Sequence, residues 1–129
     1  LDCRIVPASD PVGEGTYNAA EFTPALIKDG EKIEDSFWTG EQPRACFGIG
    51  DQGVYMLIIE GRYPDEGIRG TSVNTCSDIL LAYGCRNALN MDGGSSAILW
   101  YDGEYVTQSS SSFLRYTGGR PLPNAWVYG

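Results

Sequence analysis

A short polar stretch between two apolar runs is the part of this sequence best suited to chemistry. The stretch "DGGSS" at residues 92–96 follows the apolar residues 88–91 and precedes the apolar residues 97–101. Each apolar run is typical of a short β-strand, so the stretch would hold a carboxylate at the end of a strand. Its glycines allow positive φ and close approach by another group, and its serines add hydroxyls. This combination indicates a binding or catalytic site.

The chemistry open to such a site is limited by the absence of histidine from the 129 residues. The chain alone cannot build a Ser-His-Asp or Cys-His nucleophile or a His-ligated zinc site, so carboxylates, arginines, hydroxyls and backbone amides remain. The formal net charge of −8 argues against general affinity for nucleic acid or an anionic membrane, because such binding depends on Lys and Arg. We therefore expect any phosphate contact to be local. No apolar stretch approaches the roughly 20 residues of a membrane span.

The four cysteines, Cys3, Cys46, Cys76 and Cys85, lack the CxxC spacing of zinc and thioredoxin-like sites. Two interpretations stay open, namely two disulfides in an exported protein or buried thiols. A bridge from Cys76 to Cys85 is disfavoured, because a helix between them would hold the Cα atoms beyond the roughly 7 Å limit.

β-Hairpins are expected to position the polar stretch. Residues 24–33 contain an Asp-Gly turn between two apolar runs, which predicts one hairpin. Residues 45–59 predict a second, whose latter strand at 54–59 is apolar enough to be central in a sheet. A last strand is expected at residues 125–128.

One convincing helix accompanies these strands. Thr71 or Ser72 can cap a helix that extends through Tyr83, and Gly84 would end it. The elements together predict an α+β fold with a mixed β-sheet and one principal helix.

Three motifs in this order resemble those of the phosphodiester glycosidase domain family, which includes the "uncovering" N-acetylglucosaminidase and many bacterial exported proteins. They are "PRACFGIG" from Pro43, "EGRYPDEGIRGTSV" from Glu60 and "NALNMDGGSSA" from Asn87. The resemblance implies that residues 24–129 form the C-terminal part of such a domain, after an irregular arm at residues 1–23. In the family, the domain also contains a strand-rich part before the region that resembles this chain. An upstream segment or a partner chain would supply that part here.

The same resemblance implies which residues act. Asp92 and Glu60 would be the catalytic carboxylates. Substrate and its phosphate would be bound by Arg44, Arg62, Arg69, Asn90, Gly93, Gly94, Ser95, Ser96 and Arg120. Arg44, Arg120, Glu60 and Asp92 are expected to converge on one cleft, and the N–H groups of the link could form an anion nest. The chain departs from the family pattern at three positions, with Cys46 for alanine, Glu60 for aspartate and Ser95 for glycine.

The implied activity is hydrolysis of the glycosidic bond of a sugar-1-phosphodiester on exported or surface glycoconjugates, by a secreted or cell-surface protein. Because phosphate is a good leaving group, this reaction has little need of a strong general acid, which fits a chain without histidine. The alternatives are a non-catalytic (phospho)glycan-binding module and a structural domain of an extracellular assembly. No cofactor is expected. Oxygens of Asp92 and Glu60 would suit Ca²⁺, although no loop has the dense ligand spacing of a calcium site.

Overall fold

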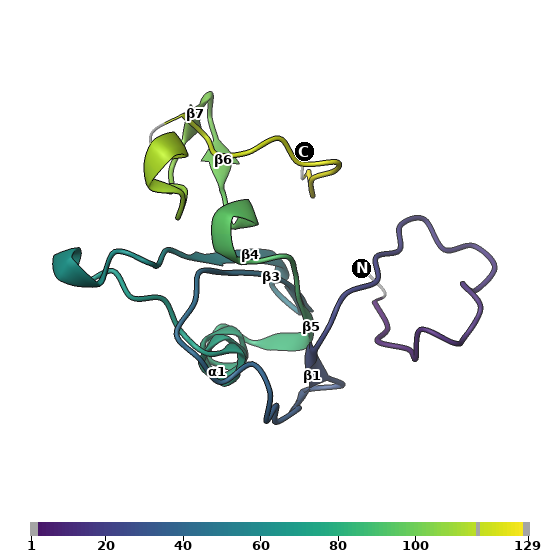
Figure 1. Ribbon diagram of the computed structural model, residues 1–129. Helices are drawn as coiled ribbons and strands as arrows, with labels where there is room; N and C mark the ends of the chain where they lie inside the picture. The colour runs from purple at the N-terminus through teal and green to yellow at the C-terminus, as the bar shows by residue number, and fades with distance from the viewer. Residues whose placement is uncertain (1–2, 116, 128–129) are drawn as a thin grey trace.

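A five-stranded antiparallel sheet is the largest unit of the computed structural model, which describes residues 3–115 and 117–127 (Figure 1). Its strands stand in the order β2-β1-β5-β3-β4. Their bounds are Ala25–Lys28 for β1, Glu31–Lys32 for β2, Arg44–Gly50 for β3, Gly53–Ile59 for β4 and Cys85–Asn90 for β5. The single α-helix of the described residues, α1 (Val73–Ala82), packs on one face of this sheet.

Smaller elements accompany this sheet in the described residues. β6 (Trp100–Tyr101) and β7 (Glu104–Tyr105) form a two-stranded sheet, and three 3₁₀ turns are present, η1 (Pro64–Glu66), η2 (Gly94–Ser96) and η3 (Ser112–Leu114). Figure 1 shows η2 and the β6–β7 hairpin opposite α1, and residues 3–23 as an open loop beside the sheet. The α+β class is confirmed. All pairings within the five-stranded sheet are antiparallel, a narrower arrangement than the mixed sheet expected.

Asp-Gly dipeptides make two of the hairpin turns. Asp29 and Gly30 have φ of 52° and 86°, and Asp102 and Gly103 have φ of 47° and 90°. Positive φ at both central residues is the requirement of a type I′ turn, which matches the twist of the flanking strands. The β1–β2 and β6–β7 hairpins therefore follow from local turn chemistry.

The ends and the buried face of α1 agree with expectation. The Ser72 hydroxyl accepts a hydrogen bond from Thr75 N at 3.2 Å, and Gly84 follows the helix with a φ of 84°. The buried residues of α1 pack against those of β1, β3 and β5 in one core, formed by Leu26, Ile27, Cys46, Val73, Cys76, Leu80, Cys85 and Ala88. Tyr83, the expected last residue of the helix, follows α1 and is 66% exposed.

Two strand predictions are wrong. β4 lies at the edge of the sheet and not at its centre. Its apolar sequence reflects two surfaces, since one set of side chains packs against the α1 core and the other faces the opposite side. Residues 125–127 form no strand, because Trp126 instead stacks on Phe47 with ring centroids 4.4 Å apart. Tyr128, the end of that expected strand, lies outside the described residues.

The edge of β4 leaves backbone hydrogen-bonding groups unused. Met91 N donates to Ala45 O at 2.8 Å, so the odd-numbered residues of β3 direct their backbone toward β5 and the even-numbered ones toward β4. The β3–β4 register then turns the N–H and C=O of Val54, Met56 and Ile58 away from β3. Within the described residues none of these groups has a backbone partner.

Arg44, at the start of β3, ties two loops to the sheet from inside the protein. The side chain lies on the α1 side and the residue is only 5% exposed. Its Nε donates to Thr71 O at 2.9 Å, and its Nη2 donates to Gly40 O at 2.8 Å and to Trp38 O at 3.3 Å. These carbonyls therefore receive charge-assisted hydrogen bonds in a place with little access to water.

Replacing Arg44 with Met retains much of the apolar stem but removes all three donated hydrogen bonds. The three part-buried carbonyls then lose their charged donor, so the free energy of unfolding should fall by about 3 kcal/mol. The control is Arg86→Met, whose side chain is 62% exposed and which should change stability by less than about 0.5 kcal/mol. Urea unfolding followed by circular dichroism measures both, and equal stability of the two variants would contradict the assignment.

Candidate functional site

The link after β5 carries an accessible ion pair. Asp92 Oδ2 accepts a hydrogen bond from Arg120 Nη2 at 3.1 Å, and the same nitrogen donates to Ser96 Oγ at 2.5 Å. The side chains of Arg120 and Asp92 are 47% and 58% exposed, so both can still meet a ligand. An arginine from near the C-terminal end of the chain thereby spans the η2 turn.

Arg62 lies against the same link from the other side. Its guanidinium sits so close to Gly94 that a Cβ on that glycine would be 3.0 Å from Arg62 Nη2. Arg62 Nε donates to Gln42 Oε1 at 3.0 Å, and Nη1 donates to Ser110 Oγ at 3.5 Å. These contacts hold a second cation beside the link that begins with Asp92.

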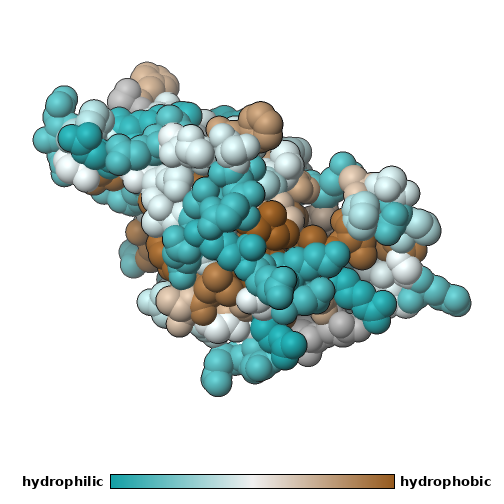
Figure 2. Space-filling model, turned by 90° about the horizontal axis from the view of Figure 1, so that it is seen from below, coloured by the Kyte–Doolittle hydropathy of each residue, from teal (hydrophilic) through white to brown (hydrophobic). Residues whose placement is uncertain are grey.

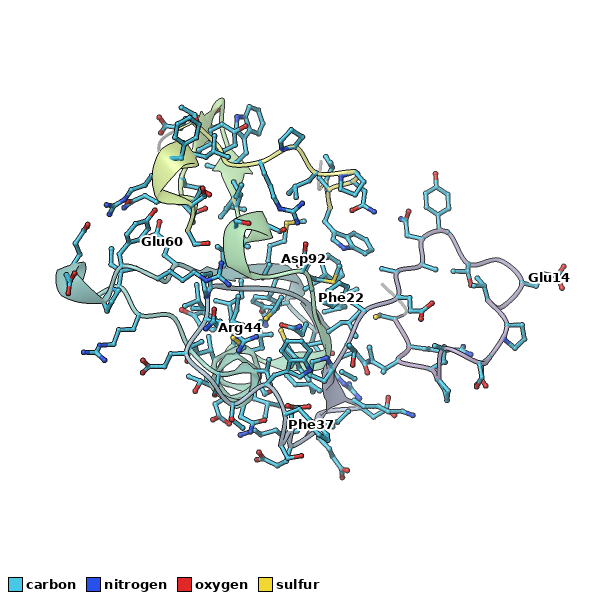
Figure 3. The ribbon with its side chains drawn as sticks, in the orientation of Figure 1. Glu14, Phe22, Phe37, Arg44, Glu60 and Asp92 are labelled. Carbon is cyan, nitrogen blue, oxygen red and sulfur yellow. The ribbon has the colours of Figure 1, made fainter. Side chains whose placement is uncertain are left out.

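Glu60 joins this group through the loop after β7. Its Oε1 accepts a hydrogen bond from Gln108 N at 2.5 Å, two residues before the serine that contacts Arg62. Figure 3 shows Glu60 and Asp92 toward the η2 side of the sheet, with Arg44 between the sheet and α1. A continuous set of contacts thus runs from Asp92 through Arg120, η2, Arg62 and the 108–110 loop to Glu60.

Three glycines bring the motifs to one place. A Cβ on Gly61 would lie 2.9 Å from Pro43 N, one on Gly70 would lie 2.4 Å from Gln42 C, and one on Gly93 would lie 2.5 Å from Pro43 O. Real Cβ atoms do not approach backbone so closely, so each of these positions requires glycine. The backbone at the start of the first motif, just before β3, is therefore the common neighbour of the other two.

Arg44 and Asn90 do not join the expected cleft. The Arg44 guanidinium is buried on the α1 side and is committed to main-chain carbonyls, so it offers a phosphate no accessible donor. Asn90 is 4% exposed, and its Nδ2 donates to Thr23 O at 2.9 Å. Four residues were predicted to converge on one cleft. Of these, Arg120, Glu60 and Asp92 belong to the connected set of contacts, whereas Arg44 does not. The geometry gives Arg44 and Asn90 structural roles.

The anion nest expected from Gly93, Gly94 and Ser95 keeps two of its three N–H donors. Gly94 N already donates to Pro43 O at 2.9 Å, and Ser96 N donates to Gly93 O at 3.0 Å. The N–H groups of Gly93 and Ser95 make no backbone hydrogen bond within the described residues. Arg69 is exposed and contributes its carbonyl, which accepts from Arg62 N at 3.5 Å.

Sequence spacing alone does not reveal the residues that support Glu60 and Arg62. Gln42 and the 108–110 loop were not predicted as part of the site, because their partners are remote in sequence and no spacing connects them.

Arg115 organises the 108–110 loop. Its guanidinium donates to both Glu66 oxygens at 2.7 and 2.5 Å, which lowers the pKa of that carboxyl, and its Nε donates to Gln108. Its Cζ also lies 3.9 Å from the centre of the Tyr63 ring.

The site lies on an open surface of the chain. Two cavities of about 250 and 360 Å³ are lined by other residues, the first around Arg86 and Asn87 and the second between β4 and α1. In residues 3–115 and 117–127 no three His, Cys, Asp or Glu side chains are grouped as metal ligands would be. Over the same residues, no helix has both the length and the apolar character needed to cross a bilayer.

Comparison with known proteins agrees with the motifs. The family model described as "Phosphodiester glycosidase" matches residues 3–128. The chain is 26% identical over 118 residues to the SPbeta prophage-derived uncharacterized protein YomE of Bacillus subtilis (strain 168), covering 87% of this chain and 18% of that protein. A hypothetical protein from Synechocystis has a crystal structure that is similar with a TM-score of 0.56 and 27% identity, covering 68% of this chain and 18% of that one. The chain thus spans about a fifth of the length of these relatives. It belongs to the phosphodiester glycosidase family.

Proposed function

We propose that this domain hydrolyses the glycosidic bond of a sugar-1-phosphodiester. The observation that carries the proposal is the Asp92–Arg120 ion pair with Arg62 held against the same link. A carboxylate and two guanidinium groups within one small surface match the two charges that such a reaction must stabilise. These are the positive charge that develops at the anomeric carbon and the negative charge of the departing phosphate.

In this mechanism Arg62 and Arg120 bind the phosphate. Guanidinium groups match phosphate oxygens with paired hydrogen bonds, and a chain with net charge −8 has to concentrate its cations locally to attract an anion. The Asp92 carboxylate then faces the anomeric carbon and stabilises the oxocarbenium-like transition state. Phosphate leaves with the electron pair of the glycosidic bond and needs no strong acid.

Glu60 acts as the second carboxylate, which directs the attacking water and accepts its proton. The hydrogen bond from Gln108 N holds one of its oxygens and leaves the other for water. Glutamate in place of the family's aspartate brings the carboxylate one methylene further from the backbone. This reach suits a site that is assembled on an open surface.

The proposed substrates are exported or surface glycoconjugates, and the proposed location is secreted or cell-surface. Both proposals are supported by the resemblance to a family with many exported members. A non-catalytic (phospho)glycan-binding domain is the second candidate, and the open surface around Asp92 favours it, because catalysis gains from exclusion of water. The experiments below distinguish turnover from binding.

Replacing Asp92 with Asn should lower turnover by ~10²-fold or more while substrate still binds, since the change removes the negative charge but keeps the side-chain size. The assay is release of N-acetylglucosamine from a sugar-1-phosphodiester. Asp102→Asn is the matched control, because this carboxylate lies in the β6–β7 turn and asparagine tolerates its positive φ. Undiminished turnover by Asp92→Asn would remove Asp92 from the mechanism, and binding of intact diester by the native chain would favour the binding-module alternative.

Replacing Arg120 with Ala should instead raise KM by about 10-fold or more, because Arg120 holds the phosphate in the ground state. It should also lower kcat, because the negative charge on the phosphate grows as it leaves. Steady-state kinetics with the same diester separates the two constants. Arg86→Ala removes an exposed arginine outside the contact set and should leave both unchanged. Equal kinetics for the two variants would show that Arg120 does not bind the phosphate.

We also infer that a partner chain or an upstream segment completes the domain by pairing with β4. Two observations support this inference. The outward N–H and C=O groups of Val54, Met56 and Ile58 form an open ladder, and β4 carries no charged residue or proline that would block pairing. An apolar cavity of about 360 Å³ lies beside this edge, between β4 and α1. Figure 2 gives the general character of the surface seen from below, where hydrophobic residues are exposed between hydrophilic ones.

Amide hydrogen exchange measured by NMR tests this pairing. In the 129-residue chain alone at low concentration, the amides of Val54, Met56 and Ile58 should exchange at least about 10-fold faster than those of Tyr55 and Leu57, which bond to β3. When the completing strand is present, all five amides should be protected. The neighbouring odd-numbered amides are the internal control, and unchanged fast exchange at the edge in the longer protein would contradict the inference.

A further inference from the structure

Exposed aromatic residues gather on the β6–β7 hairpin. Trp100 is 60% exposed, Tyr101 is 70% exposed and Tyr105 is 53% exposed. A two-stranded sheet has no core of its own, so the hairpin cannot bury these large side chains. Apolar side chains that lie together on a surface are typical of a binding site, whereas single ones need no explanation. The proposed hydrolysis uses none of these three rings.

Two of the rings stand side by side on one face of the hairpin. Trp100 and Tyr105 are direct partners across the two strands. Val106 N donates to Leu99 O at 2.9 Å, so the interstrand hydrogen bonds belong to that neighbouring pair. Trp100 and Tyr105 are therefore a non-hydrogen-bonded pair, the kind in which opposite side chains come closest. Tyr101 is the next residue along β6, so its side chain points to the opposite face.

The Tyr105 ring connects this face to the candidate site. A Cβ on Gly118 would overlap the ring, so the ring rests directly on the backbone of that glycine. Gly118 has a φ of 84° and lies two residues before Arg120. The guanidinium of Arg120 in turn donates to Asp92. The aromatic face thus continues into the segment that positions the Arg120 side chain.

A sugar ring is the ligand that matches this face. One side of a pyranose presents C–H groups, which are attracted to the electron-rich face of an aromatic ring, and its hydroxyls can bond to an indole N–H or a phenol O–H. A protein partner would require a much larger surface, of about 800 Å² on each side. Trp100 and Tyr105 offer only two rings, and the exposed, charged Asp102 and Glu104 lie at the turn beside them.

The contacts of Arg120 indicate which sugar would lie there. In the proposed reaction Asp92 faces the anomeric carbon of the sugar that is released, and Arg120 binds the phosphate. The backbone before Arg120 leads away from Asp92 to the Tyr105 ring. The group on the other ester of the phosphate therefore extends toward the hairpin.

We propose that Trp100 and Tyr105 form a stacking subsite for the sugar on the far side of the phosphate, the one that remains with the glycoconjugate after hydrolysis. The assignment rests on the proposed function and gives these two residues the selection of the glycan. Tyr105 also supports the Arg120 segment, so Trp100 is the residue whose substitution separates stacking from packing.

Isothermal titration calorimetry with two diester analogues tests the subsite. Both contain N-acetylglucosamine with a methylene group in place of the anomeric oxygen, which prevents hydrolysis, and the second ester carries either a hexose or a methyl group. The native chain should bind the hexose analogue about 10-fold more tightly than the methyl analogue. Equal affinity for the two, or no binding of either, would overturn the proposal. Equal affinity is also the result expected if the hairpin serves a protein partner.

Variants assign the preference to Trp100. Trp100→Ala should bind the two analogues with equal affinity, whereas Trp100→Phe should retain most of the preference because it keeps an aromatic face. Tyr101→Ala is the matched control, since it removes an exposed ring from the opposite face of the same hairpin and should keep the preference unchanged. A preference that survives in Trp100→Ala, or that is lost equally in Tyr101→Ala, would contradict the assignment. The comparison on the native chain needs no variant, so it remains decisive if Trp100→Ala fails to fold.

Turnover of the corresponding cleavable diesters distinguishes failure of the subsite from failure of the hydrolysis. Binding that depends on Trp100 without release of N-acetylglucosamine would contradict the hydrolysis and retain the subsite. Release from both diesters with the same KM would retain the hydrolysis and overturn the subsite.

Discussion

Close backbone packing around Gln42 and Pro43 is the constraint on which the arrangement of the site depends. Gly61, Gly70 and Gly93 come from separate parts of the chain, and each approaches this segment at a distance that leaves no room for a side chain. The turn after β4, the entry to α1 and the link after β5 are therefore stacked around one strand of backbone. This packing therefore determines where the side chains that follow these glycines lie.

Arg44 completes this arrangement from the other side of the sheet. A buried guanidinium is costly unless its donors are satisfied, and here main-chain carbonyls from two loops accept its hydrogen bonds. The result is a division between the faces of β3. The α1 side holds an apolar core with one structural cation, whereas the η2 side holds accessible cations at Arg62 and Arg120 beside the carboxylate of Asp92.

Local chemistry made much of the fold predictable. The Asp29-Gly30 turn and the Ser72 cap follow from neighbouring residues, so the corresponding hairpin and helix were expected correctly. Position within the sheet and burial of a charge depend on remote partners. The apolar run of β4 is compatible with either a central or an edge strand. The residues next to Arg44 in the sequence do not reveal which carbonyls surround its side chain in the fold. The expected last strand fails for the same reason, since Trp126 finds an aromatic partner and no strand to pair with.

The glycine packing also has a consequence for how this family can change. Gly61, Gly70 and Gly93 share one neighbour, so a side chain at any of them must displace the same piece of backbone. Once that backbone has moved, a second substitution meets a site that is already distorted, and the effects of the two are not independent. The three glycines are therefore coupled energetically, and the first substitution is expected to cost more than each one that follows it.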